Sequence, residues 1–148
     1  MISVEEQFYL DIDWFFIDGN VISFVASAGG RLPGAILKSG DNIQLLSSFF
    51  RALPIITDVT INPNLSEIMP SREINENYLS DFIFIAKRGL YAFDKTRLND
   101  FNDDRYHLVA SPQKALTIQD LPLEISDIIA KTSGCDQMRS GFNSLSIF

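Results

Sequence analysis

Three aspartates are the residues of this chain whose type and spacing best suit acid–base catalysis. Asp11 and Asp13 lie two positions apart in a stretch expected to be extended, so they share one strand face, and Asp94 ends a later expected strand. Clustered carboxylates can raise one another's pKa and so serve acid–base chemistry. The simpler explanation, which we favour, is that strand ends are wet and tolerate acidic side chains there without any function.

Nucleophilic catalysis has little support in the sequence. His107 is the only histidine, so any Ser-His or Cys-His pair must use it, and no G-x-S-x-G turn is present to expose a serine. Cys135, the only cysteine, lies in a polar segment with no local feature that would lower its pKa. We therefore expect no catalytic residues, and we expect His107 to be a half-exposed strand residue.

Metal and phosphate motifs are incomplete. One histidine and one cysteine cannot supply a structural zinc site. Residues 100–104 match the opening of a calcium loop, but Arg105 stands where glycine is needed and Ser111 stands where a bidentate glutamate belongs. Gly29 and Gly34 have P-loop spacing, but the lysine that should follow is missing. We expect neither a metal nor a cofactor.

The charge balance limits the classes of partner. The chain of 148 residues has 19 acidic and 12 basic residues, which gives a net charge of −7. Such a field repels phosphate backbones and anionic membrane surfaces, so nucleic-acid and membrane partners are disfavoured. A basic protein partner would suit an acidic surface, although acidity also serves solubility.

The compartment follows from composition. A single cysteine excludes an internal disulfide, which is typical of a reducing compartment. Residues 1–11 lack the basic start and apolar core of a signal peptide, and no apolar run approaches the ~20 residues of a membrane span. We expect a cytoplasmic protein.

A β-hairpin over residues 11–30 is the clearest structural signal. Gly19-Asn20 lies between two apolar runs, and both residue types tolerate the positive φ that tight hairpin turns require. This turn places Ile17 opposite Ile22 and Phe15 opposite Phe24 on one side. The other side carries Trp14, Phe16 and Val25, with Ser23 opposite Phe16. A hairpin that is apolar on both sides should be covered on both.

Three helices are predicted from apolar periodicity and end signals. The first is capped within residues 39–42 and ends at Pro54. The second begins near Ser71 and stops at Gly89; the competing interpretation is a hairpin joined across residues 87–89. The third begins at 120–122 and ends before residue 134.

The remaining segments predict strands at 55–62, 90–94 and 106–110, and a short extended piece at 116–118. Residues 135–148 could form an edge strand, through Phe142, Leu145, Ile147 and Phe148, or a flexible tail. We therefore predict a single α+β domain over residues 1–148. It has a mixed or antiparallel sheet of about five strands with an N-terminal hairpin, packed with about three helices.

Two stretches, DIDWFFIDGNVISFVASAG and RGLYAFD followed by YHLVASPQKALTIQDLP, resemble a group of small, largely uncharacterised bacterial proteins. These open with a D-x-D-W-F-x-x-D hairpin and later carry a G-L-Y-x-[FY]-D segment, a proline and a closing L-P. The matching residues are Asp11, Asp13, Trp14, Phe15, Asp18, Gly89, Leu90, Tyr91, Phe93, Asp94, Pro112, Leu121 and Pro122. The short turn at Gly19-Asn20 departs from the group.

The resemblance implies an immunity-type or toxin-linked accessory domain, which neutralises a partner by binding it. The candidate binding residues are Asp11, Asp13, Trp14, Tyr91 and Asp94. The expected function is therefore a non-enzymatic protein-binding module that engages a protein, such as a basic toxin, through an acidic surface. Two alternatives stay open: a small enzyme or ligand-binding domain in which Asp11, Asp13 and Asp94 converge within a few ångströms, and an assembly subunit.

Overall fold

A computed structural model describes residues 2–132, 137–138 and 144–147. Its helices are α1 (Val4–Tyr9), α2 (Gly34–Leu37), α3 (Gly40–Arg51), α4 (Leu65–Ile68), α5 (Glu76–Ala86) and α6 (Leu123–Thr132), with a 3-10 turn at Ile118–Asp120. Its strands are β1 (Asp13–Asp18), β2 (Val21–Ala26), β3 (Val59–Ile61), β4 (Tyr91–Lys95), β5 (Arg105–Pro112), β6 (Gln137–Met138) and β7 (Ser144–Ile147). The predicted α+β class is confirmed.

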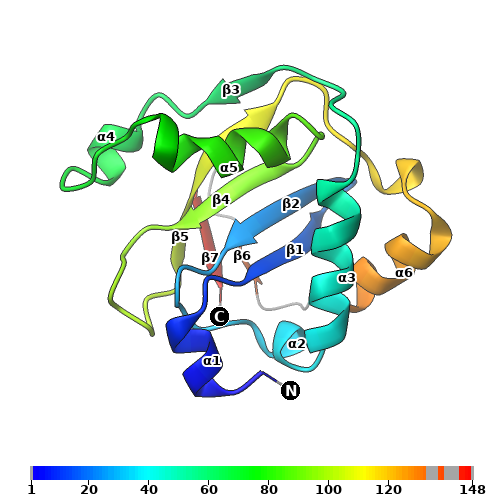
Figure 1. Cartoon of the computed structure of the whole chain (residues 1–148), viewed down its shortest axis with the longest axis horizontal. Coiled ribbons are helices and arrows are strands. Elements are labelled where there is room, and N and C mark those ends of the chain that lie inside the picture. The colour runs from blue at the N-terminus through cyan, green and yellow to red at the C-terminus, as the bar shows by residue number, and fades with distance from the viewer. Residues whose placement is uncertain (1, 133–136, 139–143, 148) are drawn as a thin grey trace.

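One mixed sheet runs through the molecule (Figure 1). Its strand order is β1-β2-β4-β5-β7-β6, and β3 pairs with β5 beside this path. The β2–β4 pair is parallel and the other pairs are antiparallel. Parallel strands need a long crossover, and α3 and α5 lie in the connection between β2 and β4.

The N-terminal hairpin has the predicted register. Ile17 pairs with Ile22 and Phe15 pairs with Phe24. Gly19 alone takes a positive φ in the turn, at 64°, so the turn depends on this glycine.

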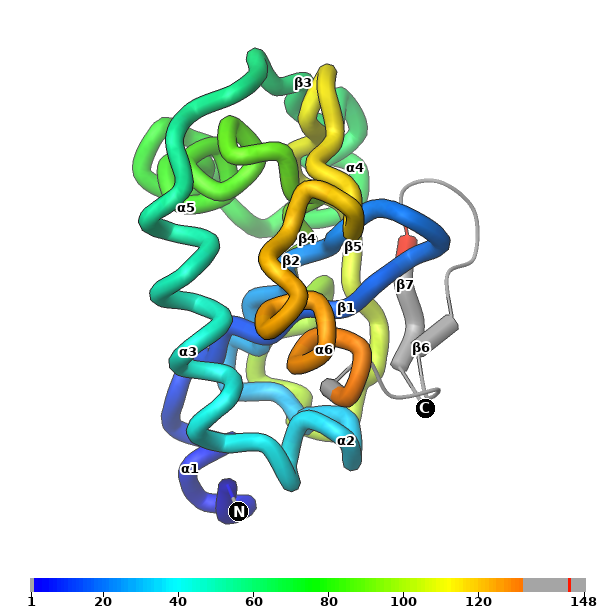
Figure 2. The backbone as a smooth tube through the Cα atoms, turned by 90° about the vertical axis from the view of Figure 1, so that its right-hand side faces the viewer, coloured from blue at the N-terminus to red at the C-terminus, as the bar shows by residue number. Residues whose placement is uncertain are grey.

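Both faces of the hairpin are buried, as predicted. One face carries Phe15 and Phe24 into a core shared with Phe50 of α3, Phe82 of α5 and Ile125 of α6. On the opposite face, a second core holds Trp14, Phe16, Val25, Leu32, Ile36, Phe93 and Tyr106. Figure 2 shows α3 and α5 together on one side of the sheet.

The second predicted helix is confirmed over the competing hairpin, but its predicted start at Ser71 is wrong. The helix begins at Glu76, because the Asn75 side chain accepts a hydrogen bond from the backbone N–H of Tyr78. Gly89 takes a φ of 96°, and a Cβ there would lie 2.7 Å from the backbone nitrogen of Leu116. Glycine is therefore required just after the helix.

The predicted strand at 55–62 is too long. Only Val59–Ile61 pairs, and Ile55 is 60% exposed. In the short extended piece predicted at 116–118, Thr117 is extended and forms an isolated bridge to Val21, but Ile118 already begins the 3-10 turn.

At the C-terminal end, β7 pairs with both β5 and β6, so the outer strand within residues 135–148 is β6, and Leu145 and Ile147 lie in the inner strand β7. Cys135, Phe142 and Phe148 lie outside the described residues. Within the described part of the chain, no helix has the length and apolarity needed to cross a bilayer.

Candidate functional site

One row of paired strand residues contains three polar side chains. In strand register, Asp13 lies beside Ala26, Ala26 beside Asp94, and Asp94 beside His107. Two strand spacings separate Asp13 from Asp94, which is about 9.6 Å between backbones. The two aspartates therefore share a row, with Ala26 between them, and they hydrogen-bond to different side chains.

Asp13 is held by α3 close to the surface. Its Oδ2 accepts from Arg51 Nη2 at 2.8 Å and from Ser47 Oγ at 3.1 Å. The same guanidinium reaches Asp81 of α5 through two bonds of 2.7 and 3.0 Å. These two aspartates raise the pKa of Arg51, since its charged form gains two anionic partners. This cluster ties α3 and α5 to the sheet.

Asp94 has a different environment. It is 3% exposed, so the expectation that this strand end is wet is wrong for Asp94. Tyr78 of α5 donates to its Oδ2 at 2.6 Å, Arg72 Nη1 donates to the same oxygen at 3.3 Å, and the Lys95 backbone N–H donates to Oδ1. Burial raises the pKa of Asp94 above its ordinary value, while these three donors oppose that rise.

His107 completes this network. It is 2% exposed, so the expected half-exposed residue is instead buried. Its Nε2 lies 3.4 Å from the Tyr78 hydroxyl, and its Nδ1 lies 3.0 Å from Thr96 Oγ1. Because the Tyr78 proton goes to the Asp94 carboxylate, Nε2–H must donate to Tyr78 and Thr96 must donate to Nδ1. Burial, with Arg72 nearby, lowers the pKa of His107 to about 4.

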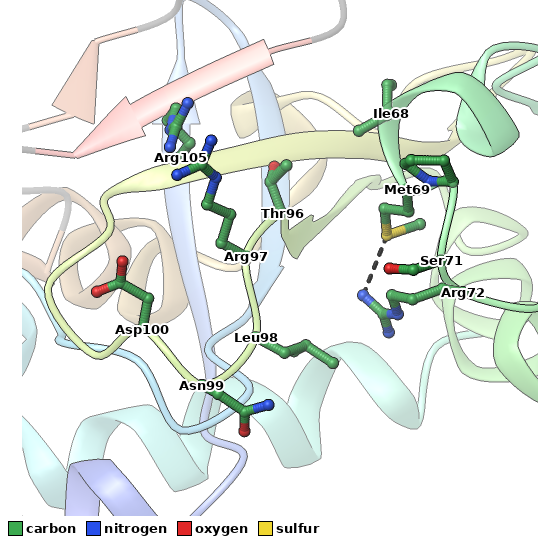
Figure 3. A pocket seen from close by; sticks show the side chains of 11 residues that line it. Ile68, Met69, Ser71, Arg72, Thr96, Arg97, Leu98, Asn99, Asp100 and Arg105 are labelled. Atoms are coloured by element: carbon green, nitrogen blue, oxygen red, sulfur yellow. Dashed lines mark hydrogen bonds between the residues drawn. The ribbon is translucent and has the colours of Figure 1, made fainter.

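A pocket of about 810 Å³ adjoins this network (Figure 3). Arg72 and Thr96 both line it. Arg72 also hydrogen-bonds to Asp94, and Thr96 also hydrogen-bonds to His107. Its other lining residues are Ile68, Met69, Pro70, Ser71, Arg97, Leu98, Asn99, Asp100 and Arg105. The pocket therefore lies between the segment around α4 and the loop that joins β4 to β5.

The other predicted binding residues are dispersed. Asp11 is exposed and accepts from the Ala28 backbone N–H at 2.9 Å. It lines a small hollow of about 220 Å³ together with Asp13. Trp14 is 1% exposed, in the core of the opposite sheet face, and the half-buried Tyr91 packs against that core. A Trp14 contact with a partner would need the core to open.

Sequence reasoning missed a second surface, formed by α1. Four large apolar side chains are more than half exposed there: Val4 at 67%, Phe8 at 54%, Tyr9 at 75% and Leu10 at 51%. Acidic residues adjoin them, namely Glu5 and Glu6 within α1 and Asp11 just after it. We call these seven residues the α1 surface. The sequence signal that could have indicated this surface is the mixture of apolar and acidic residues over 4–11.

Several contacts hold α1 rigidly. Ser3 and Glu6 form a reciprocal capping box at its start. Gln7 is 2% exposed, and its Oε1 accepts from the backbone N–H of Leu32 at 3.0 Å. Gly29 takes a φ of 74°, and a Cβ there would lie 2.6 Å from the carbonyl oxygen of Phe8. Close contact between α1 and this loop thus depends on glycine.

The described residues contain no group of three or more His, Cys, Asp or Glu side chains placed to hold a metal ion. The network around Asp94 combines acidic, basic and phenolic groups, and its hydrogen bonds are made within the protein.

We find no protein-family model, curated protein or solved structure that matches this chain. The functional argument therefore depends on the geometry of these two regions.

Proposed function

We propose that this chain is a non-enzymatic, protein-binding module of the immunity type, which neutralises or regulates a basic protein partner in the bacterial cytoplasm. The observation that carries the proposal is the α1 surface. Val4, Phe8, Tyr9 and Leu10 present apolar area to solvent in one short segment. Clustered exposed apolar residues mark interaction sites more often than scattered ones do.

The chemistry of the α1 surface specifies its partner. An apolar centre with Glu5, Glu6 and Asp11 at its margin suits a protein surface with an apolar hollow and a basic rim. Phe8 contacts Phe101, with 6.1 Å between ring centroids, so the acidic loop containing Asp100 lies beside α1. The net charge of −7 would speed association with a basic partner by electrostatic steering.

Rigidity favours this surface over a flexible segment. The capping box and the buried Gln7 fix α1 before any partner arrives. Binding then costs less side-chain and backbone ordering, so more of the contact energy contributes to affinity.

The test is binding to basic proteins encoded beside this gene, measured as a dissociation constant at about 50 and about 500 mM salt. We expect a complex that weakens at high salt. The Tyr9→Ala substitution should weaken it by about 30-fold, because truncating a central aromatic costs about 2 kcal/mol. Leu123→Ala is the matched control, since Leu123 is 77% exposed but lies on α6.

Charge is tested separately. Glu5→Lys should slow association more than Glu124→Lys in the first turn of α6, which makes the same change in net charge outside the α1 surface. Glu5 is preferable to Glu6 because Glu6 also caps α1. Affinity that is equal in the Tyr9→Ala and Leu123→Ala variants would refute the proposal. Self-association that Tyr9→Ala abolishes would identify a second copy as the occupant instead.

A further inference from the structure

The side chains that line the pocket beside Asp94 carry a net positive charge, opposite in sign to that of the whole protein. The chain has only 12 lysines and arginines against 19 acidic residues, yet three arginines line this one pocket. Asp100 is the single acidic residue among its described lining residues. Figure 3 shows Arg97 and Arg105 on one side of the hollow and Arg72 on the other.

Each of these arginines forms an ion pair with a carboxylate. Arg72 Nη1 lies 3.3 Å from Asp94 Oδ2, while Arg105 Nη2 and Arg97 Nε lie 2.6 and 3.8 Å from Asp103 Oδ2. The side chains of Asp94 and Asp103 are only 5% and 7% exposed. Those of Arg72, Arg97 and Arg105 are 25%, 61% and 51% exposed. The positive groups therefore face the solvent of the pocket, and the negative groups face the protein.

The arginines retain donors for a ligand. Among the described residues, the side-chain hydrogen bonds of Arg72 come from Nη1 alone, and a guanidinium has five N–H donors. The Arg72 guanidinium also stacks on the Tyr78 ring, 4.8 Å from its centroid, which fixes its plane. Ser71 adds a hydroxyl to the same lining.

We propose that this pocket binds the phosphate group of a small phosphate monoester, between Arg72 on one side and Arg97 with Arg105 on the other. A phosphate monoester carries close to two negative charges at neutral pH and three terminal oxygens, which suits a site with three guanidinium groups better than a single carboxylate does. Ile68, Pro70 and Leu98 provide apolar walls for the organic part of the molecule. This site shares no residue with the α1 surface, although the loop containing Asp100 borders both, and it does not depend on the protein-binding proposal.

The test is isothermal titration at pH 7.5 with inorganic phosphate and with glycerol 3-phosphate, against acetate and chloride at equal ionic strength. We expect saturable binding of both phosphates and not of acetate or chloride. Tighter binding of glycerol 3-phosphate would show that the apolar walls contact the ligand. Equal binding would assign the site to the phosphate group alone, which also supports the proposal.

Variants connect the binding to the pocket. Arg97→Gln should weaken phosphate binding at least tenfold, and this variant should fold normally because Arg97 is 61% exposed. Arg72→Lys keeps the charge but loses the fork, and should weaken binding as well. Lys114→Gln makes the same charge change at an exposed position outside the pocket, and should leave affinity within twofold. Binding that Arg97→Gln and Lys114→Gln alter equally, or no binding beyond that of chloride, would overturn the proposal.

Discussion

Asp13 and Asp94 occupy the same row of one sheet and yet have different physical roles. Asp13 lies near the surface, where an arginine from α3 neutralises it and a second aspartate shares that arginine. Asp94 is buried, and a tyrosine hydroxyl is its closest partner. The helix above each residue causes the difference, because α3 supplies a cation where α5 supplies a phenol.

This contrast separates a structural ion pair from a network with functional potential. Partly exposed ion pairs contribute little, since water already solvates their charges. A buried carboxylate depends on every donor around it, because a lost donor leaves it uncompensated. Perturbed titration of a carboxylate and an imidazole is therefore expected around Asp94, beside the arginine-lined pocket.

The largest expected effect is the pH dependence from His107. Its pKa of about 4 in the folded protein lies below the ordinary value of 6.5. Between these values the unfolded chain binds a proton that the folded protein does not, so stability is complete above pH 6.5 and falls toward pH 4. The loss should be about 3 kcal/mol.

Urea unfolding at several pH values measures this loss. The His107→Gln variant is the comparison, because it removes the titrating ring and keeps a polar side chain. Asp94 acts in the opposite sense, since its raised pKa adds stability as pH falls, and it is present in both proteins. Equal pH slopes in the two proteins would contradict the assignment to His107.

The next effect is the loss of the Tyr78 hydroxyl. Tyr78→Phe keeps the ring beneath Arg72 but removes the donor to Asp94 Oδ2. Because that acceptor is buried and charged, we expect the free energy of unfolding to fall by about 2 kcal/mol. Tyr9→Phe removes a hydroxyl from a side chain that is 75% exposed and should change stability negligibly. Similar losses of stability in both variants would contradict the claim that the buried Asp94 depends on the Tyr78 hydroxyl.

The smallest effect belongs to the Asp13 side of the row. Arg51→Met keeps an apolar stem against Phe24 and Phe84 while removing both ion pairs. We expect a loss of about 1 kcal/mol in chemical denaturation, part of which high salt should mask in the wild type. A loss greater than that of Tyr78→Phe would reverse the comparison between the two aspartates.

Local signals predicted the hairpin and the longer helices well. The Gly19-Asn20 turn sets the register of β1 and β2 by itself, since each strand follows directly from it. The start of α5 was harder, because Ser71 and Asn75 are both good capping residues and only packing distinguishes them. The alternating pattern of residues 55–62 predicted a longer strand, but the exposure of Ile55 depends on packing that this pattern does not report.

The candidate site was largely beyond sequence reasoning. Asp94 could be named from its motif, but its burial depends on Tyr78, which lies on another element. His107 joins the network only because β5 pairs beside β4. Likewise, Arg72 and Arg97 come from separate loops, and nothing in their local sequence indicates a common pocket.

The parallel β2–β4 pair has a consequence for synthesis of the chain. Ser23 of β2 pairs with Phe16 in the hairpin and with Tyr91 of β4 on its other side. The ribosome adds Phe16 before Ser23, but it adds Tyr91 much later. Such distant pairing forms late, because a long loop must close first. During translation, one edge of a strongly apolar hairpin therefore stays open until β4 has left the ribosome. Truncated products that end before residue 91 should be prone to aggregate through this edge.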